Sequence, residues 1–288
     1  MQSYAVHFMG QSDLGFTSSL ADPDVWLRPA IKCCGFTYYE YIFLYVDNLL
    51  VISEHPNIVM KAINDQYRMK EGSIMKPELY LGAQIKEFPA PGSTRACWSI
   101  STEKYLKGAY HNVKIDLGKI NKRLPNNVPT PLSSGYRLEL DVSVPLDDNY
   151  VHWYQKLIGI VRWAIELRRI DIHLSVALLA QCLVEPRVGH LDQVFHIFAY
   201  LKSHIRSKIV LDAPKPIIDE NQFLPADWTE FYPDASEPIP LNAPETRGND
   251  VIISCFIDAD HAGNQVMQHS HTGVIIFCNQ VPIMWFSK

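Results

Sequence analysis

Residues 41–53 read Tyr-Ile-Phe-Leu-Tyr-Val-Asp-Asn-Leu-Leu-Val-Ile-Ser, which is the most informative stretch of the sequence. Two apolar, β-prone runs flank the polar pair Asp47 and Asn48, which is the pattern of a buried hairpin with a polar tip. An ionised carboxylate beside such a sheet needs a charged partner or a metal ion to offset its desolvation. Taken alone, the pair is also explained as a tight turn, because Asp and Asn both tolerate the left-handed backbone conformation.

The composition is that of a globular protein long enough for one large domain or two ordinary ones. The chain has 288 residues, of which 47% are hydrophobic and 20% are charged, and its formal net charge is −5. Free-standing nucleic-acid-binding proteins are more often basic, so the global charge argues against that class, although charge is unevenly distributed. The six cysteines form no Cys-x-x-Cys pair and no zinc-type cluster with histidine, which predicts reduced, mostly buried thiols.

The sequence predicts a soluble, intracellular protein that does not contact a membrane. Its N-terminal residues lack the basic and apolar regions of a secretory signal, and no run of about 18 apolar residues occurs. Whether the protein works in the cytoplasm or the nucleus stays open.

Hydrophobic periodicity predicts hairpins and helices in the first 204 residues. Residues 1–40 are predicted to be irregular, because turn-forming residues cluster around Pro23. A helix is predicted over 55–70, and a second hairpin joins 79–85 to 97–100 across a Pro/Gly turn. Further helices are predicted over 101–117, over 150–182 with a junction at 170–172, and over 190–204.

The last part of the chain changes character twice. Residues 211–250 hold seven prolines and nine Asp or Glu, against Lys215 and Arg247 as the only cations, which predicts an acidic, Pro-rich tether. After it, a strand is predicted over 251–260, followed by two more over 274–278 and 281–286.

The stretch around Asp47 resembles the Tyr-x-Asp-Asp hairpin of reverse transcriptases, in the Tyr-Val-Asp-Asp form of Ty1/copia-type retrotransposons. In that family three Asp residues hold two Mg²⁺ ions about 3.5–4 Å apart for nucleotidyl transfer. The resemblance implies that Asp47 is a catalytic metal ligand and that Asn48 occupies a degenerate catalytic position, with one negative charge fewer. The third Asp belongs to a strand well upstream of the hairpin, and the sequence contains no matching strand.

The resemblance continues in the same order along the chain. The matching segments are 14–16 with 22–26, 80–85, 130–132, 154–172 and 190–202. By this resemblance Tyr45, Tyr80, Leu81 and Gly82 contact nucleic acid, the last three in a hairpin that positions the primer strand. Taken singly, each match is also explained by core packing or helix capping.

The C-terminal segment resembles the start of a Ty1/copia-type ribonuclease H domain, with the pattern Asp-x-Asp-x-Ala-Gly…Ser-x-x-Gly…Trp-x-Ser-Lys between Asp258 and Lys288. The resemblance implies that Asp258 is a catalytic metal ligand, whereas Asp260 supports the structure or another ligand. The remaining catalytic Glu and Asp are expected after Lys288. Ribonuclease H also works with two metal ions, so Mg²⁺ is the cofactor that the resemblance implies for both sites.

Together, the patterns and the resemblance predict an α+β fold. The expected parts are a partial reverse transcriptase palm over 1–100, a helical thumb/connection over 101–210, the tether over 211–250 and a truncated ribonuclease H-like domain over 251–288. The partners that the resemblance implies are an RNA template, an RNA–DNA hybrid and the rest of a Pol polyprotein.

Three functions remain open at this point. The chain is a reverse transcriptase/ribonuclease H fragment, expected to be inactive because its carboxylates are incomplete. Alternatively it is a non-catalytic nucleic-acid-binding remnant, which the six Lys or Arg against two Asp or Glu over 101–130 favour. The third possibility is a functionless relic of a decayed element, which would expose apolar sheet edges.

Overall fold

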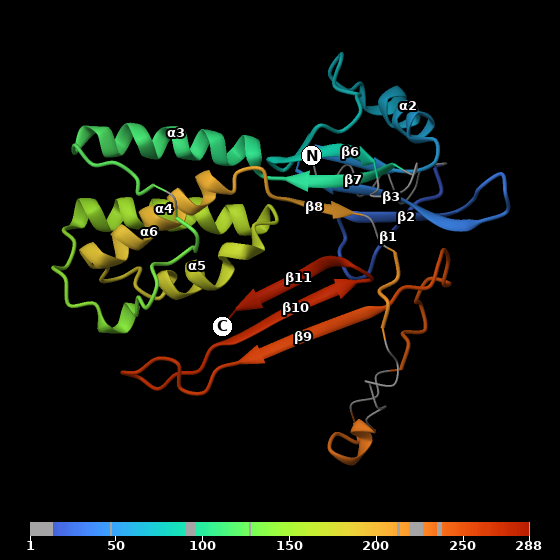
Figure 1. Cartoon of the computed structure of the whole chain (residues 1–288). Coiled ribbons are helices and arrows are strands. Elements are labelled where there is room, and N and C mark those ends of the chain that lie inside the picture. Colours follow the sequence, from blue (N-terminus) through green and yellow to red (C-terminus); the bar gives the residue numbers. More distant parts are fainter. Residues whose placement is uncertain are drawn as a thin grey trace. The chain divides into compact units, whose positions relative to one another are not determined.

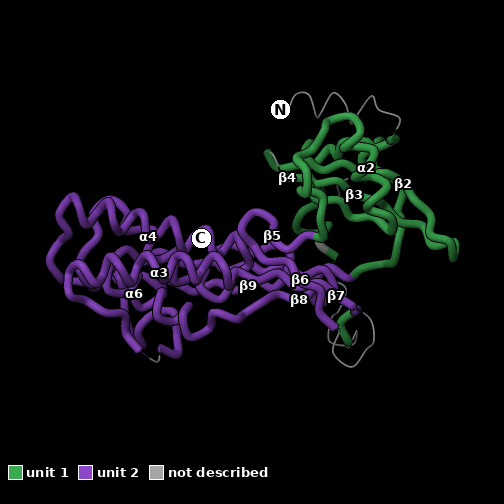
Figure 2. Tube along the Cα trace, turned by 90° about the horizontal axis from the view of Figure 1, so that it is seen from above, with its two compact units in different colours: residues 1–76, 215–251 green, residues 77–214, 252–288 purple. Residues whose placement is uncertain are grey.

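The computed structural model describes residues 14–46, 48–89, 96–126, 128–211, 214–218, 227–234 and 238–287. The chain divides into two compact units, coloured separately in Figure 2. Unit 1 comprises Met1–Lys76 and Lys215–Val251, and unit 2 comprises Pro77–Pro214 and Ile252–Lys288. The four domain boundaries expected from the sequence stay a prediction, because compactness does not report evolutionary origin.

Unit 1 is built on a four-stranded antiparallel sheet with the strand order β1-β2-β3-β4. The strands are β1 (Thr17–Ser18), β2 (Val25–Ile31), β3 (Thr37–Tyr45) and β4 (Asn48–Ile52). Helix α2 (Pro56–Tyr67) follows, and a short 3₁₀ turn, η4, spans Trp228–Glu230. The predicted hairpin and the predicted helix after it are therefore both confirmed.

The core of unit 1 lies between the sheet and α2. Trp26 and Ile42 face each other across β2 and β3, and they pack with Phe16 and with Val59 and Ile63 of α2. Because side chains alternate between the faces of a strand, one face of the hairpin is buried and the other is half-exposed. The hairpin is thus less buried than its apolar sequence predicted.

The prediction that residues 1–40 are irregular is wrong for the described part, because β1 and β2 belong to the sheet. Pro29 is the reason why the sequence did not predict β2, since proline is expected only where a strand has an unpaired N–H. Lys32 N bonds Phe36 O and Leu44 N bonds Asp24 O, so the backbone nitrogen of Pro29 points away from β3. On that side β1 pairs only with Leu27 and Trp26, so no ladder hydrogen bond is lost at Pro29.

Unit 2 contains a second four-stranded antiparallel sheet and a group of four helices. Figure 1 labels the helices and β6, β7 and β8, and Figure 2 labels β5. The strands are β5 (Leu79–Tyr80), β6 (Ala83–Pro89), β7 (Ala96–Ser101) and β8 (Lys208–Leu211). The helices are α3 (Glu103–Lys119), α4 (Asp148–Glu166), α5 (His173–Ala180) and α6 (Val188–Ser203), with 3₁₀ turns η1 (Leu138–Leu140) and η2 (Ile170–Ile172). The predicted second hairpin and all the predicted helices are confirmed, although the Pro/Gly turn lies outside the described residues.

The main hydrophobic core of the molecule joins these four helices. Its buried side chains recur at helical spacing on one face of each amphipathic helix, as Leu106, Ala109, Val113 and Leu117 do on α3. Tyr154 on α4 is fully buried there, and its hydroxyl donates to Leu179 O at 2.6 Å. The same core extends to Trp285 in the C-terminal part of the unit.

The C-terminal part of unit 2 is a three-stranded antiparallel sheet with the order β11-β10-β9. The strands β9 (Ile253–Ala259), β10 (Thr272–Cys278) and β11 (Val281–Ser287) confirm the three that the sequence predicted. The predicted α+β class is therefore correct. None of the helices in the described part of the chain is both long and apolar enough to span a membrane.

Candidate nucleic-acid interface and carboxylate positions

The tip of the β3–β4 hairpin carries the positions expected to be catalytic in a polymerase. Asp47 lies outside the described residues. Tyr45 ends β3 and is 49% exposed, and Asn48 begins β4 opposite it. The turn therefore starts one residue earlier than the sequence suggested, at Val46, whose φ of 55° is unusual for a β-branched residue.

The two C-terminal carboxylates have different environments. Asp258 lies in β9 opposite Gly273 and is exposed to solvent. Asp260 instead accepts a hydrogen bond from His271 N at 2.5 Å, while Asp260 N donates to His271 O at 3.0 Å. The Asp260 side chain also lies against Gly263, where a Cβ atom would be 1.7 Å from a carboxylate oxygen. Asp260 thus closes the loop between β9 and β10 and is not directed at a ligand.

The carboxylates described in the structure do not by themselves fit a divalent metal. Mg²⁺ is bound through oxygen ligands held in a near-octahedral arrangement. Within the described ranges, no group of three or more His, Cys, Asp or Glu lies close enough together to hold a metal ion. Asp258 therefore belongs to no such group among the described residues.

Helix α3 presents a basic outer face opposite its buried one. Lys104, Lys107, Lys114 and Lys119 are all exposed on it, and they alternate with small or polar residues such as Gly108. Lys107 pairs with Glu103 at 2.7 Å and Lys119 pairs with Asp116 at 2.8 Å, both within the helix. Exposed ion pairs of this kind are weak, so a phosphate chain can compete for these lysines.

The turn between β5 and β6 lies against the same group of helices. Leu81 and Gly82 both have positive φ values, of 52° and 92°, which makes glycine the favoured residue at the second position. A Cβ atom on Gly82 would lie 3.5 Å from Leu167 and 3.7 Å from the indole nitrogen of Trp163. The predicted nucleic-acid-binding turn Tyr80, Leu81 and Gly82 therefore lies close to the C-terminal end of α4.

One further contact connects this turn to α3. The side-chain oxygen of Gln84, at the start of β6, accepts a hydrogen bond from Lys104 N at 3.1 Å. Lys104 is in the first turn of α3, where backbone N–H groups lack helical partners. The structure thus brings the Tyr80–Gly82 turn and the basic face of α3 into one continuous part of unit 2.

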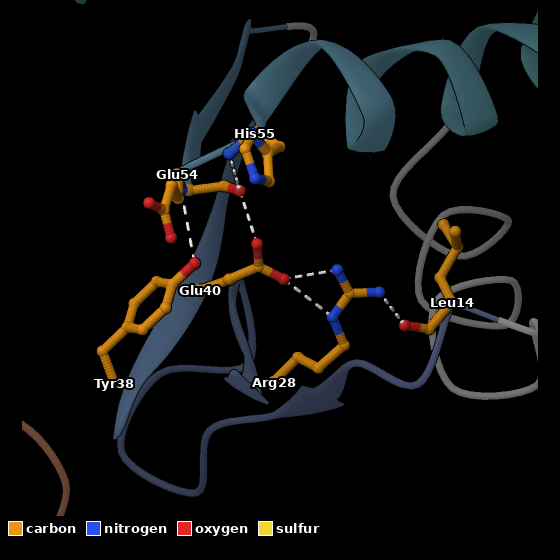
Figure 3. A network of polar contacts seen from close by, with 7 residues as sticks. Leu14, Arg28, Tyr38, Glu40, Glu54 and His55 are labelled. Carbon is orange, nitrogen blue, oxygen red and sulfur yellow. Dashed lines mark hydrogen bonds and ion pairs between the residues drawn. The ribbon is translucent and has the colours of Figure 1, made fainter. Parts of the chain in front are cut away.

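Sequence reasoning missed a buried ion pair in unit 1, drawn in Figure 3. Glu40 on β3 is only 6% exposed and faces Arg28 on β2, whose Nε donates to Oε2 at 2.9 Å. The other carboxylate oxygen accepts a hydrogen bond from the Ser53 hydroxyl, and Ser53 Oγ in turn accepts from His55 N at 2.9 Å. Burial alone would raise the pKa of Glu40, but the hydrogen bonds of Ser53 and Arg28 and the charge of Arg28 outweigh it, so the pKa is lowered.

A buried arginine explains part of a segment that resembled the reverse transcriptase pattern. Arg169 is 2% exposed, and its Nε and Nη2 donate to the two oxygens of Asp171 at 2.8 and 2.6 Å. Its Nη1 donates to His204 O at 3.2 Å, and its guanidinium lies 6.0 Å from the centre of the Tyr200 ring. The pair therefore joins the ends of α4 and α6 through η2, and its role is structural.

His190, which also matched the family pattern, has a structural role as well. Its Nδ1 accepts a hydrogen bond from Arg187 N at 3.0 Å. Its Nε2 lies 3.1 Å from Leu138 O, and because a carbonyl oxygen can only accept, Nε2 donates this hydrogen bond. The Cys182 thiol lies 3.8 Å from the same nitrogen. Burial and the nearby Asp141 carboxylate raise the pKa of Cys182 to about 11, so this cysteine is not an activated nucleophile.

The prediction that the cysteines are mostly buried is wrong. All six are free thiols, but only Cys97 is buried, while Cys182 and Cys278 are half-buried. Cys33, Cys34 and Cys255 are exposed, the first two in the turn between β2 and β3 and the third in β9. The cysteine pattern of the sequence therefore did not predict how buried the thiols are, because half of them lie in a turn and on an edge strand.

Comparison with known proteins gives a distant but extensive similarity. The chain is 24% identical over 251 residues to a putative transposon Ty5-1 protein of Saccharomyces cerevisiae, covering 86% of this chain and 65% of the yeast protein. It is also 21% and 22% identical to the retrovirus-related Pol polyproteins from transposons RE1 and RE2 of Arabidopsis thaliana, covering 96% of this chain and 15% of each polyprotein. The chain is a distant relative of retrotransposon Pol polyproteins.

This similarity shows only a general relation to these proteins, because the chain spans less than two thirds of the length of each of them. No protein-family model matches the sequence, and no solved structure matches it either. The similarity covers both units, since the alignments with the plant polyproteins include almost the whole chain. The retrotransposon relation expected from the motif series is therefore confirmed.

Proposed function

We propose that this chain corresponds to the reverse transcriptase and early ribonuclease H region of a Ty1/copia-type Pol polyprotein, and that it binds nucleic acid without catalysing nucleotidyl transfer. The order of the motif-like segments supports the assignment, together with the distant relation to retrotransposon Pol polyproteins. The β3–β4 hairpin and the three C-terminal strands are the two places where the family would hold its carboxylates. The lack of activity follows from the carboxylates themselves.

Nucleotidyl transfer and ribonuclease H cleavage both need clustered anionic ligands. A divalent metal such as Mg²⁺ would supply charge stabilisation for the transferred phosphate at such a cluster. The residues that would hold it are Asp47 at the hairpin and Asp258 in β9. At the hairpin Asn48 supplies a neutral amide in place of a carboxylate, and in β9 the neighbouring Asp260 is bound to its own loop. Neither position therefore supports a catalytic step.

We expect the purified 288-residue protein to extend no DNA primer on an RNA template in the presence of Mg²⁺. The reason is that replacing a carboxylate by an amide removes both a charge and an anionic metal ligand. The measurement is gel analysis of a labelled primer after single-turnover incubation at high protein concentration. The variant Asn48→Asp serves as the matched comparison, because it restores the carboxylate without changing the length of the side chain. Extension by the unaltered protein would refute the proposal that it is inactive.

The proposed binding function rests on the basic outer face of α3. Its lysines lie on one exposed face of a long helix that is held rigidly by the core on its other side. Between residues 101 and 130 the sequence has six Lys or Arg and only two Asp or Glu, although the whole chain is acidic. A positively charged face of this kind attracts the phosphate backbone without reading sequence, and the contact releases counterions from the nucleic acid. An RNA–DNA hybrid or duplex is the ligand that we propose for it.

Replacing Lys104 and Lys114 by glutamine should weaken binding of a labelled RNA–DNA hybrid by about tenfold at low salt. The slope of log affinity against log salt concentration should also become shallower by about 2, one for each lost phosphate contact. Fluorescence polarisation over a salt series measures both quantities. The double variant Lys61→Gln and Lys70→Gln is the control, since these exposed lysines lie on unit 1. Equal loss in both double variants would assign the effect to net charge, and no binding by the unaltered protein would refute the proposed function.

A further inference from the structure

Strand β9 forms the open edge of the C-terminal sheet, where β10 is its only neighbour in the described part of the chain. Its large apolar side chains are exposed, with Ile253 at 58%, Phe256 at 61% and Ile257 at 69%. Natural edge strands are usually protected by lysine, proline, a bulge or a covering element. β9 contains no lysine or proline and pairs with β10 in an unbroken register from Ile253 to Ala259. Among the described residues no element covers this edge, and Asp258 is its only charged side chain, so the edge is open to pairing.

The direction of the backbone groups along this edge follows from two hydrogen bonds at its ends. Asp260 N donates to His271 O, and Ile252 O accepts from Asn279 N, so the even-numbered residues exchange hydrogen bonds with β10. In an antiparallel ladder the alternate residues turn both groups to the other side. Ile253, Cys255, Ile257 and Ala259 therefore present their N–H and C=O groups at the open edge.

We propose that β9 pairs with β9 of a second copy of this chain, in antiparallel orientation, to form a sheet that is continuous across a two-fold axis. The axis passes beside Phe256, which faces Phe256 of the second copy, so that Ile253 faces Ala259. This register is the one in which every residue of β9 is paired. It forms about eight backbone hydrogen bonds, all of them from the outward-facing residues.

The side chains of β9 are self-complementary in this register. Ser254 faces Asp258, so that a hydroxyl donor meets a carboxylate acceptor, and Cys255 faces Ile257 on the other face of the sheet. The exposed Phe256 rings meet at the axis, where each already packs edge-on against Phe277 of its own chain at 5.7 Å. A register centred on Asp258 would bring two carboxylates together and is disfavoured. The Ser254–Asp258 pairs, the exposed Phe256 rings and the direction of the backbone groups therefore all favour this register with a second copy of the chain.

The first test is sedimentation velocity of the full chain over a wide concentration range. We expect a monomer–dimer equilibrium whose dissociation constant rises at least about tenfold in Ile257→Pro. This proline removes an outward-pointing N–H and leaves the β9–β10 ladder intact. Ile239→Pro is the control, because Ile239 is also exposed, at 84%, but lies outside the sheets, and it should leave the equilibrium unchanged. A monomer at every concentration, or an open series of larger species, would overturn the proposal.

A second test reports the register itself and does not depend on a proline. Phe256→Cys is made in a background where Cys33, Cys34 and Cys255, the exposed thiols, are serine. Facing residues at a non-hydrogen-bonded pair have Cα atoms about 4.5 Å apart, within the range of a disulfide. We expect mild oxidation to cross-link this variant into a dimer, and Ile257→Cys in the same background to cross-link much less. Equal cross-linking of the two variants, or none in either, would overturn the register.

Discussion

Arg169→Ala is expected to lower the free energy of unfolding of unit 2 by about 3 kcal/mol. The guanidinium is buried, and it donates to both oxygens of Asp171 and to the carbonyl of His204. Removing it leaves a partly buried carboxylate without its cation and a helix-terminal carbonyl without its donor. It also removes the contact with the Tyr200 ring. The loss falls on the junction that holds the ends of α4 and α6 together.

Two comparisons separate this effect from a simple loss of charge. Arg169→Lys keeps the cation but cannot form the two parallel hydrogen bonds, so it should recover only part of the stability. Arg162→Ala removes an exposed arginine from α4 and should change stability by less than about 0.5 kcal/mol. Urea unfolding followed by circular dichroism at the helical band is the appropriate measurement, since the long helices α3, α4 and α6 lie in unit 2. Equal stability of the lysine variant and the unaltered protein would contradict the proposed geometry.

The secondary structure of this chain was largely predictable because most of its elements are local. The hairpin β3–β4 and the helices α3, α4 and α6 each carry their own apolar period, and the structure contains all of them. Strand β8 was not predicted, because its four residues pair with β7 more than a hundred positions earlier in the chain. No short window of sequence contains that information. Strand β2 was hidden by Pro29, whose position on an open side could be judged only from the assembled sheet.

The sequence indicated which residues belong to the candidate sites, but not what surrounds their side chains. The resemblance identified Asp258, Arg169 with Asp171, and His190, and the structure gives the last three a role in joining and capping helices. The ion pair of Glu40 had a signal that was overlooked. Glu40 and Ile42 share one face of β3, so a charged residue stood on the inward face of a strand, where it needs a partner. The partner itself, Arg28, follows only from the pairing of β2 with β3.

Glu40→Ala is expected to destabilise unit 1 by about 3 kcal/mol, because it leaves Arg28 without its carboxylate and Ser53 without its acceptor. The Arg28 side chain is 30% exposed and keeps its bond to Leu14 O at 2.6 Å, which places the loss at the lower end of the range for buried pairs. Ser53 connects Glu40 to the backbone at the start of α2, so the docking of that helix should weaken as well. Trp26 is buried in this unit but is one of six tryptophans in the chain, so its fluorescence is followed during denaturation in a background where the other five are replaced.

The same carboxylate should make the stability of unit 1 depend on pH in the acid range. Because the pKa of Glu40 is lower in the folded state, its ionised form stabilises the fold fully above the unfolded value of about 4.3. That contribution is lost as the pH falls through the lower, folded pKa. Glu40→Gln keeps the size of the side chain but cannot titrate, so the difference in unfolding free energy between the two proteins should shrink as the pH falls below the unfolded value. A difference that stays constant over this range would show that Glu40 is not held as a buried, ionised partner of Arg28.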